Sequence, residues 1–257
     1  MKILEFFINL MMANKDLTVR FEMLREIGKI LVPDYRFKWP QIEWWSDLVF
    51  NKYLVRFSEI NNMNTDRRWM LYQLMRLVIK VPGDTAECGV YTGAGSYIIC
   101  RMNEENELVN RTHHLFDSFE GLSKPSECDG THWKEGVLSC PVEIVRENLS
   151  MFNNISIHKG WIPQRFPDIE NQSFCFIHID VDLYRPTLDS LEFFYPRTNE
   201  GGIIVCDDYG FTTCPGATKA VNEFLQDKPE KMISLSGGGG FIIKGTETSK
   251  PLLLKVD

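Results

Sequence analysis

The sequence predicts an α/β protein with a Rossmann-like fold, built on a mostly parallel sheet. From residue 84 onward, short runs that are apolar throughout alternate with amphipathic segments, which is typical of buried parallel strands connected by helices. Two β-rich runs follow the last helical segment and predict an antiparallel hairpin at the C-terminal edge of the sheet. The length of 257 residues allows one large domain with an accessory segment.

The N-terminal part has helical spacing, many aromatic residues and proline breaks, and it carries no obvious chemistry. We expect residues 1–60 to form an accessory helical cap and residues 61–257 to form the main domain. A first helix is expected over residues 1–16, because its apolar residues fall on one side. These residues are Ile3, Phe6, Phe7, Leu10 and Met11. Glu5 and Asn9 interrupt this apolar stretch, which disfavours a signal peptide.

The main domain is expected to begin with a helix over residues 65–80, with Thr65 as its N-cap and Pro82-Gly83 as its stop. After it, strands and helices alternate. The predicted strands are TAECGV (85–90), THHLFDSF (112–119), ISIHKGW (155–161), FCFIHIDVD (174–182) and GGIIVCDDYG (201–210). The predicted helices are 93–106, 141–152, 185–198 and 217–228, and the closing hairpin is formed by 231–238 and 240–245.

Composition excludes several classes of protein. A net charge of −7 disfavours a nucleic-acid binder, since neutralising phosphates needs a basic face. The sequence has no apolar run of 18 residues, so no membrane span is expected. The seven cysteines are odd in number and lack a C-x-x-C pair. They predict reduced structural thiols and a cytoplasmic location rather than a disulfide framework or a zinc site.

Two predicted strand ends suggest a nucleoside site. Small residues follow Glu87 in the run Gly89-Val-Tyr-Thr-Gly93-Ala-Gly95-Ser96, just before a helix. Such residues let a ligand approach the backbone, although this run is neither G-x-G-x-x-G nor a P-loop. Asp117 ends the next strand, 22 residues after Gly95, and an acid at this distance typically accepts hydrogen bonds from ribose hydroxyls. A turn-capping role is the alternative for Asp117.

Two later strands end in carboxylates, and these predict a metal site. Asp180 and Asp182 follow one apolar strand, and Asp207 and Asp208 follow the next. Burying such a cluster without a partner is costly, so a cation is the natural partner. Oxygen ligands favour Mg²⁺, Mn²⁺ or Ca²⁺ over zinc. Asp182 is expected to cap the following helix instead.

Seven segments in this order resemble the macrocin O-methyltransferase family over about residues 62 to 245. They are TAECGVYTGAGS, LFDSFEGL, VEIVRENL, KGWIP, IDVDLYRPTLDSLEFFYP, GGIIVCDDYG and GGGGFIIKG. The resemblance implies an S-adenosylmethionine-dependent methyltransferase domain over residues 61–257. It also implies a divalent cation, with Mg²⁺ as the first choice, and a sugar hydroxyl as the methyl acceptor.

The resemblance also implies roles for particular residues. The loop after Glu87 would hold the methionine part of the cofactor, and Asp117 with Ser118 would hold its ribose. The loop residues are Glu87, Gly89, Tyr91, Gly93 and Ser96. Gly93→Val is expected to obstruct the cofactor. The metal ligands would be Asp180, Asp207 and Asp208, and Asp180 is also assigned to catalysis.

Mechanistically, the resemblance favours transfer of a methyl group to a hydroxyl of a sugar or glycosylated metabolite. His132 is expected to be the general base, because it lies in a polar loop that can fold over the strand ends. Strand alternation is expected to point His178 away from the neighbours of Asp180. The base could also be a carboxylate or water.

Two other functions remain open. A metal-dependent glycosyltransferase could use Asp180-Val-Asp182 as its D-x-D motif, and the chain could also be a non-catalytic, methyltransferase-like binding subunit. The expected partner is a small-molecule or glycan acceptor, with no nucleic acid. We also expect self-association through apolar residues of the N-terminal segment, namely Phe6, Phe7, Trp44 and Trp45. The alternative is that this segment packs over its own active site.

Overall fold

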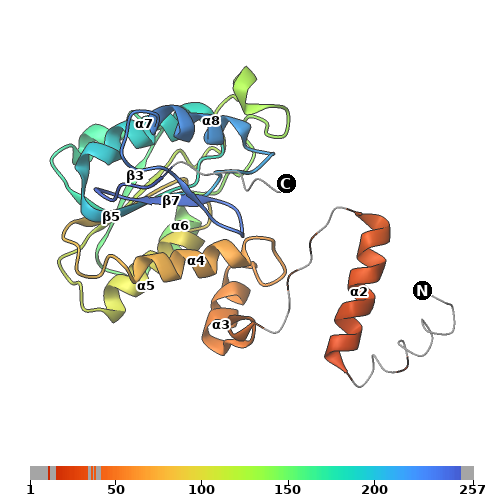
Figure 1. The fold of residues 1–257 in the computed structure, drawn as a ribbon. Coiled ribbons are helices and arrows are strands. Elements are labelled where there is room, and N and C mark those ends of the chain that lie inside the picture. Colours follow the sequence, from red (N-terminus) through yellow and green to blue (C-terminus); the bar gives the residue numbers. More distant parts are fainter. Residues whose placement is uncertain (1–10, 12–15, 34–35, 37, 39–41, 250–257) are drawn as a thin grey trace. The chain divides into compact units, whose positions relative to one another are not determined.

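The computed structural model describes residues 11, 16–33, 36, 38 and 42–249 (Figure 1). The chain divides into two compact units, Met1–Arg56 and Phe57–Asp257. Within the first unit, the structure describes α2 (Leu17–Leu31), the 3-10 helix η1 (Glu43–Ser46) and α3 (Leu48–Arg56). The helix predicted over residues 1–16 and the residues Phe6 and Phe7 lie outside the described residues, apart from the end of that helix.

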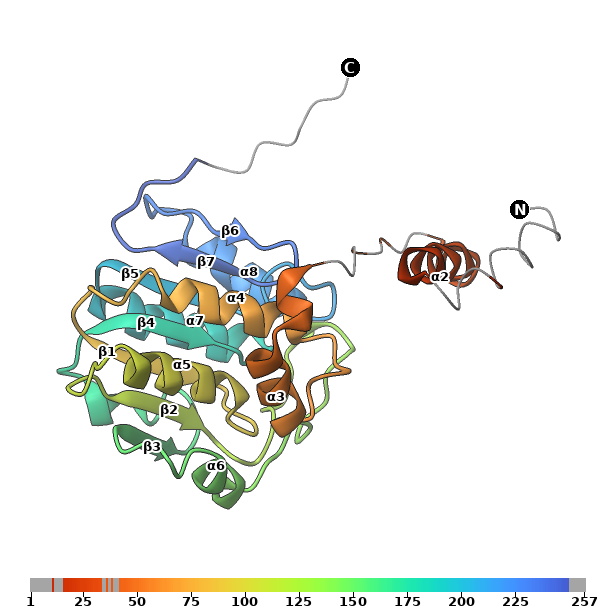
Figure 2. The ribbon, with the colours of Figure 1, turned by 90° about the horizontal axis from the view of Figure 1, so that it is seen from below.

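The second unit is built around a seven-stranded sheet. Its strands are β1 (Asp84–Cys88), β2 (His113–Asp117), β3 (Ile155–Lys159), β4 (Phe174–Ile179), β5 (Thr198–Cys206), β6 (Ile233–Ser234) and β7 (Gly240–Ile243). The strand order is β3-β2-β1-β4-β5-β7-β6 (Figure 2). The first five strands pair in parallel, and β7 pairs antiparallel with both β5 and β6. This arrangement confirms the predicted parallel sheet with an antiparallel hairpin at its edge.

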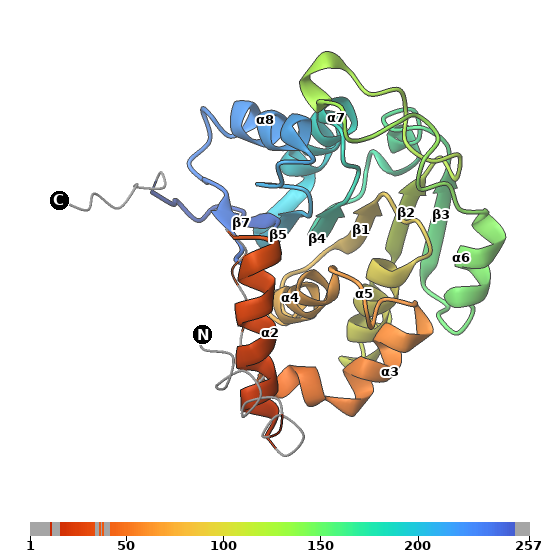
Figure 3. The same cartoon turned by 90° about the vertical axis from the view of Figure 1, so that its right-hand side faces the viewer.

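Helices cover both faces of the sheet. They are α4 (Thr65–Met75), α5 (Ala94–Glu105), α6 (Val142–Asn148), α7 (Tyr184–Phe194) and α8 (Pro215–Phe224). Short 3-10 helices lie between them: η2 (Glu127–Asp129), η3 (Phe166–Ile169) and η4 (Tyr195–Arg197). Helices α4 and α5 lie on one face, and α7 and α8 lie on the other (Figures 1 and 3). Every residue of β4 is therefore buried, as expected for a strand covered on both sides.

The face beneath α7 and α8 holds the larger apolar core. Phe116, Phe174 and Phe194 are fully buried there, and their rings pack edge to face. Each such side chain contributes about 1.5–3 kcal/mol when it leaves water. This packing holds the sheet rigid beneath the loops at its carboxyl edge. Among the residues that the structure describes, no helix combines the length and the apolar character needed to cross a membrane.

Some predicted boundaries differ from the structure. The helix predicted over 65–80 ends at Met75 and has Asn64 at its N-cap, so Thr65 is its first residue. A series of turns replaces its last part, because the chain must reverse before β1. Thr198, predicted to end a helix, begins β5 instead. The strand predicted over 174–182 ends at Ile179, which places Asp180 and Asp182 in the loop that follows.

Candidate active site

A cavity of about 710 Å³ lies at the carboxyl ends of the parallel strands. Its walls include the loops that follow β1, β2, β4 and β5. The chain runs outward from β1 in one direction and from β4 in the other, so the cavity lies at the topological switch point, where open α/β sheets bind ligands. Five of the predicted cofactor residues line it: Glu87, Gly89, Tyr91, Asp117 and Ser118.

The carboxylate of Asp117 ties two of these loops together. Its Oδ2 accepts hydrogen bonds from the backbone N–H groups of Val90 at 2.7 Å and Tyr91 at 3.1 Å. Its Oδ1 accepts one from the N–H of Phe119 at 2.7 Å. A carboxylate has about four acceptor positions, so one position remains for a ligand hydroxyl. The turn-capping role and a ligand-binding role are therefore compatible for Asp117.

Two glycines let backbone and side chains approach closely beside the cavity. A Cβ atom on Gly89 would lie 1.8 Å from the carbonyl oxygen of Asp180, and Gly89 has a φ of +81°. A Cβ atom on Gly95 would lie 2.1 Å from Oε1 of Glu87. Both positions therefore require glycine. Gly89 lets the end of β1 approach the backbone of Asp180, and Gly95 lets α5 approach the side chain of Glu87.

The other two predicted cofactor residues face away from the cavity. A Cβ atom on Gly93 would meet Leu149 and Val145 of the α6 region at 3.6 Å, not the cavity. The reason for expecting Gly93→Val to obstruct a cofactor is therefore wrong, because the valine side chain would enter the apolar layer beneath α6. Ser96 is fully buried and donates a hydrogen bond to Oε2 of Glu87.

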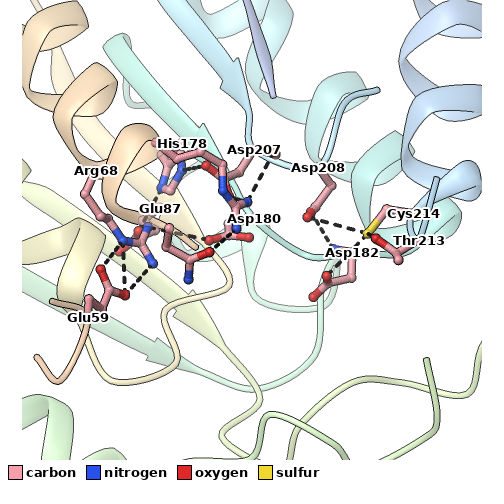
Figure 4. Close-up of polar contacts among 12 residues, drawn as sticks. Glu59, Arg68, Glu87, His178, Asp180, Asp182, Asp207, Asp208, Thr213 and Cys214 are labelled. Carbon is pink, nitrogen blue, oxygen red and sulfur yellow. Dashed lines mark hydrogen bonds and ion pairs between the residues drawn. The ribbon is translucent and has the colours of Figure 1, made fainter. Parts of the chain in front are cut away.

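The four carboxylates that follow β4 and β5 form two groups (Figure 4). Asp180 and Asp207 lie with His178, and their potential ligand atoms are within 4.8 Å of one another. Asp182 and Asp208 form a similar group with Cys214. The predicted ligand set of Asp180, Asp207 and Asp208 is thus distributed over both groups.

Asp182 does not cap the following helix, contrary to expectation. The N-cap of α7 is Leu183, and Asp182 has a φ of +59°. Its N–H donates to Oδ2 of Asp208 at 2.7 Å, and its Oδ1 accepts from the thiol of Cys214 at 3.6 Å. Burial and then the charges of Asp208 and Asp180 raise the pKa of Asp182 to about 9. Burial and the charge of Asp180 likewise raise the pKa of Asp208.

These raised pKa values mean that three carboxylates, on Asp180, Asp182 and Asp208, repel one another beside the cavity that all three line. A cation bound beside these carboxylates would reduce the repulsion. The donor set therefore fits a divalent ion.

His178 points toward the carboxylates, so the expectation that it faces away from them is wrong. Its Nδ1 lies 2.8 Å from Oε1 of Glu87, and its Nε2 lies 3.3 Å from Oδ1 of Asp207. The side chain is 1% exposed. Alternation along β4 correctly assigns His178 to one face, but the register that pairs it with Glu87 on β1 brings it into the site.

Two arginines of α4 also reach the site, and sequence reasoning missed both. Arg67 donates from one guanidinium nitrogen to Oδ2 of Asp207. Arg68 forms a bidentate pair with Glu59, at 2.9 and 3.1 Å, and its NH1 lies 3.8 Å from Oδ2 of Asp180. The adjacent pair of arginines was visible in the sequence, but nothing there indicated that α4 would carry it to the strand ends.

The predicted base, His132, is exposed on the loop that connects β2 to α6. Its ring packs edge to face on that of Trp133, with centroids 4.7 Å apart. Trp133 lines the cavity and donates from Nε1 to the sulfur of Cys214 at 3.2 Å. His132 is not among the described residues that line the cavity, whereas its neighbour Trp133 is.

Two solved structures with this architecture are described as methyltransferases. The structure of the O-methyltransferase NovP superposes with a TM-score of 0.61 and 26% identity, over 70% of this chain and 80% of that chain. CalS11, a calicheamicin methyltransferase, superposes with a TM-score of 0.62 and 19% identity, over 84% of this chain and 97% of that chain. The fold is therefore the Rossmann-like fold of the O-methyltransferases, as predicted.

Residues 63–234 match the family model described as Macrocin-O-methyltransferase (TylF). This chain belongs to that family, which confirms the resemblance of its motifs. The demethyldecarbamoylnovobiocin O-methyltransferase of Streptomyces niveus is 28% identical over 173 residues, or 62% of this chain and 65% of that protein.

A second relative comes from Streptomyces olivaceus. This 8-demethyl-8-(2,3-dimethoxy-alpha-L-rhamnosyl)-tetracenomycin-C 4'-O-methyltransferase is 30% identical over 148 residues, or 53% of this chain and 57% of that protein. The matched part of the chain thus spans about three fifths of the length of these two relatives.

Proposed function

We propose that this protein is an O-methyltransferase that moves a methyl group from S-adenosylmethionine to a hydroxyl of a sugar or glycosylated metabolite, with the help of a divalent cation. One observation carries the proposal: a single cavity joins the glycine-containing loop and Asp117 to three carboxylates that follow β4 and β5, those of Asp180, Asp182 and Asp208. The rhamnosyl group in the name of the tetracenomycin relative supports a sugar hydroxyl as the acceptor.

For the cofactor, we propose that the loop at Gly89 and Tyr91 holds the methionine part. Asp117 offers its remaining acceptor position to a ribose hydroxyl, and Ser118 lies beside it in the cavity wall. Gly93 and Ser96 support this loop from outside the cavity. Gly93 is the N-cap of α5 and has a left-handed conformation, and Ser96 donates a hydrogen bond to Glu87. Bound S-adenosylmethionine would supply the methyl group to an acceptor aligned by the cavity walls.

For the cation, the carboxylates proposed from the sequence are Asp180, Asp207 and Asp208, with Mg²⁺ as the ion. Asp180 and Asp207 lie together, which supports them as ligands. An ion held there would bind an acceptor hydroxyl and lower its pKa. The protein surrounds the site with Arg67 and Arg68, which orient the two carboxylates and limit their mutual repulsion.

For the proton, we propose His132 as general base, delivered by the loop that places Trp133 in the cavity wall. Asp182 is the second group able to accept a proton, since it lines the cavity and its raised pKa makes it more basic than an ordinary carboxylate.

Isothermal titration calorimetry with S-adenosylmethionine or a nucleotide sugar, each with and without Mg²⁺, tests the proposal directly. We expect S-adenosylmethionine to bind and the nucleotide sugar not to bind in its absence. Tight, Mg²⁺-dependent binding of a nucleotide sugar together with no binding of S-adenosylmethionine would favour a D-x-D glycosyltransferase instead. Binding of S-adenosylmethionine without methyl transfer to any glycoside acceptor would favour a binding subunit.

A further inference from the structure

A run of four glycines, residues 237–240, packs against the loop that follows β5. A Cβ atom on Gly238 would lie 2.0 Å from Cζ of Phe211. A Cβ atom on Gly239 would lie 2.9 Å from the carbonyl oxygen of Asp207. Both glycines also have a positive φ, of +93° and +74°. Glycine is therefore needed at these two positions for close contact with the loop as well as for backbone conformation.

The ring of Phe211 connects this glycine run to α4. Its outer edge, at Cε1, Cε2 and Cζ, lies against Gly238. The guanidinium carbon of Arg67 lies over the ring, 5.0 Å from its centroid. A guanidinium within about 6 Å of an aromatic centroid is attracted to the face of the ring. The missing side chain of Gly238 thus leaves the space in which Phe211 can lie beneath Arg67.

Arg67 in turn holds Asp207. One guanidinium nitrogen donates to Oδ2 of Asp207 and, at 3.4 Å, to its carbonyl oxygen, and the other nitrogen donates to Oδ1 of Asn64. The side chains of Arg67 and Asp207 are only 17% and 6% exposed. Charged hydrogen bonds are strong where water is largely excluded, so this contact fixes both the side chain and the backbone of Asp207.

We propose that Phe211 and Gly238 are positioning residues of the cation site. Gly238 leaves room for the ring of Phe211, the ring holds Arg67, and Arg67 keeps Asp207 in the orientation in which this carboxylate binds the cation. The glycine run then serves the site as well as the turn between β6 and β7. The inference rests on the cation of the proposed function and deepens it, because it assigns a role to residues that do not touch the ion.

Calorimetric titration of the chelator-treated full chain with Mg²⁺, and separately with Mn²⁺, tests the inference. We expect Phe211→Leu to weaken binding of both ions by about three- to tenfold, because Arg67 loses its aromatic partner and Asp207 becomes less ordered. This substitution leaves the charge of the site unchanged. Arg67→Ala is a poorer test, since it also removes a positive charge and so favours a cation.

A second variant, Gly238→Ala, acts on the ring from the other side. We expect it to weaken ion binding at least about threefold in the wild type, because the added Cβ displaces Phe211, and less than about twofold in Phe211→Leu, where the ring is gone. Gly201→Ala is the control for backbone strain, with a φ of +79° and an ordinary contact of 3.6 Å to Val81. It lies in the first half of β5 and should leave the ion affinities unchanged.

A purely structural role would give a different result. It would lower the melting temperatures of Phe211→Leu and Gly238→Ala in EDTA and leave both ion affinities unchanged at a temperature well below melting. Ion affinities that stay within about twofold of a measurable wild-type value therefore overturn the inference, and the cation of the proposed function stands. An equal effect of Gly238→Ala in the two backgrounds also overturns it, because the ring would then not transmit the effect.

The remaining outcomes concern the proposed function. Failure of the wild type to bind either ion overturns this inference and the cation of the proposed function together. The expected losses of ion affinity, found in a protein that transfers no methyl group to any glycoside, support the positioning role and contradict the proposed reaction.

Discussion

Gly89 controls the junction between the ends of β1 and β4. Its φ of +81° costs an alanine about 1–2 kcal/mol. A Cβ atom would also lie 1.8 Å from the carbonyl oxygen of Asp180, so the loop that carries Asp180 would have to move. The position therefore couples backbone geometry to the proposed metal site.

We expect Gly89→Ala to destabilise the fold by about 1–3 kcal/mol more than the same change at a glycine that has equal backbone strain but open space around it. The reason is that overpacking at Gly89 adds to the backbone strain. Gly136 is that control, since its φ is +80° and no atom lies within 4 Å of the added Cβ. Urea denaturation of both variants measures the difference. Equal losses of stability would show that the contact with Asp180 is unimportant.

The pKa of Asp182 predicts how stability depends on pH when divalent ions are removed. Its folded-state pKa is raised to about 9, so the folded state binds this proton more tightly than the unfolded chain. The stabilisation that this bound proton gives to the folded state is present in full below the unfolded-state pKa of about 3.9. It is lost as the pH rises through the folded-state pKa. The melting temperature of chelator-treated protein should therefore fall between pH 5 and 9.

Asp182→Asn should flatten this decline, because the amide is neutral at every pH. Glu143→Gln, an exposed change on α6, is the matched control and should leave the slope unchanged. Differential scanning calorimetry in the presence of EDTA gives the slopes. A wild-type melting temperature that rises over this interval would contradict the assigned direction of the shift.

His132 is the residue on which the proposed proton transfer depends. General-base catalysis contributes about 10²–10⁴-fold, so His132→Ala should lower kcat by at least about a hundredfold, with little change in the affinity for S-adenosylmethionine. Lys134→Ala, an exposed change on the same loop, serves as control. A loss of less than about threefold from pH 6 to 9 would be too small for a general base and would favour Asp182 as the proton acceptor.

At the scale of the elements, the carboxylate of Asp129 anchors the loop between β2 and α6. Asp129 is 3% exposed, and its Oδ1 accepts the N–H of Tyr184, the first residue of α7, at 2.6 Å. Its Oδ2 accepts the N–H of Ser126 at 2.7 Å, within the same loop. The Asp129 carboxylate thus accepts a hydrogen bond from the first residue of α7. It also holds the loop segment that places Trp133 in the cavity wall.

We expect Asp129→Ala to cost about 1–2 kcal/mol of stability through the lost cap of α7. The loop over residues 121–140 should also become more sensitive to proteolysis, because Ser126 loses its partner. Limited proteolysis with mass spectrometry and urea denaturation measure the two effects. Glu127→Ala, an exposed neighbour, should change neither, and an unaltered loop in Asp129→Ala would show that other contacts hold it.

For the whole molecule, self-association through the first unit stays a prediction. Helix α2 carries exposed apolar side chains, with Leu24 56% exposed, Ile27 42% and Leu31 76%. Apolar stripes of this kind are typical of helices that pack against a partner. We expect light scattering to give about twice the chain mass of 29.8 kDa at micromolar concentration.

Leu24→Glu should reduce that mass to the value of a single chain, because a charge in the stripe opposes its burial. Leu77→Glu, an equally exposed leucine of the second unit, is the control and should leave the mass unchanged. A wild-type mass equal to that of one chain would instead favour packing of the first unit within its own molecule.

Much of the fold and the location of the cavity followed from local patterns. Five of the six residues of β4 are apolar or aromatic, with His178 as the exception, and this pattern required a strand covered on both faces. Parallel strands direct their carboxyl ends to one edge, so Asp117, Asp180 and Asp208 had to lie near one another. Hydrophobic burial and chain direction are encoded locally, which is why the sequence was sufficient for these features.

The pairing of charges within the cavity was decided by tertiary structure. Strand alternation placed His178 on a face, but only the register between β1 and β4 set it beside Glu87. Only the packing of α4 within the second unit brought Arg67 to Asp207 and Arg68 toward Asp180. These contacts join residues up to 140 positions apart, and their geometry depends on ångström-level offsets between elements, which local sequence patterns do not encode.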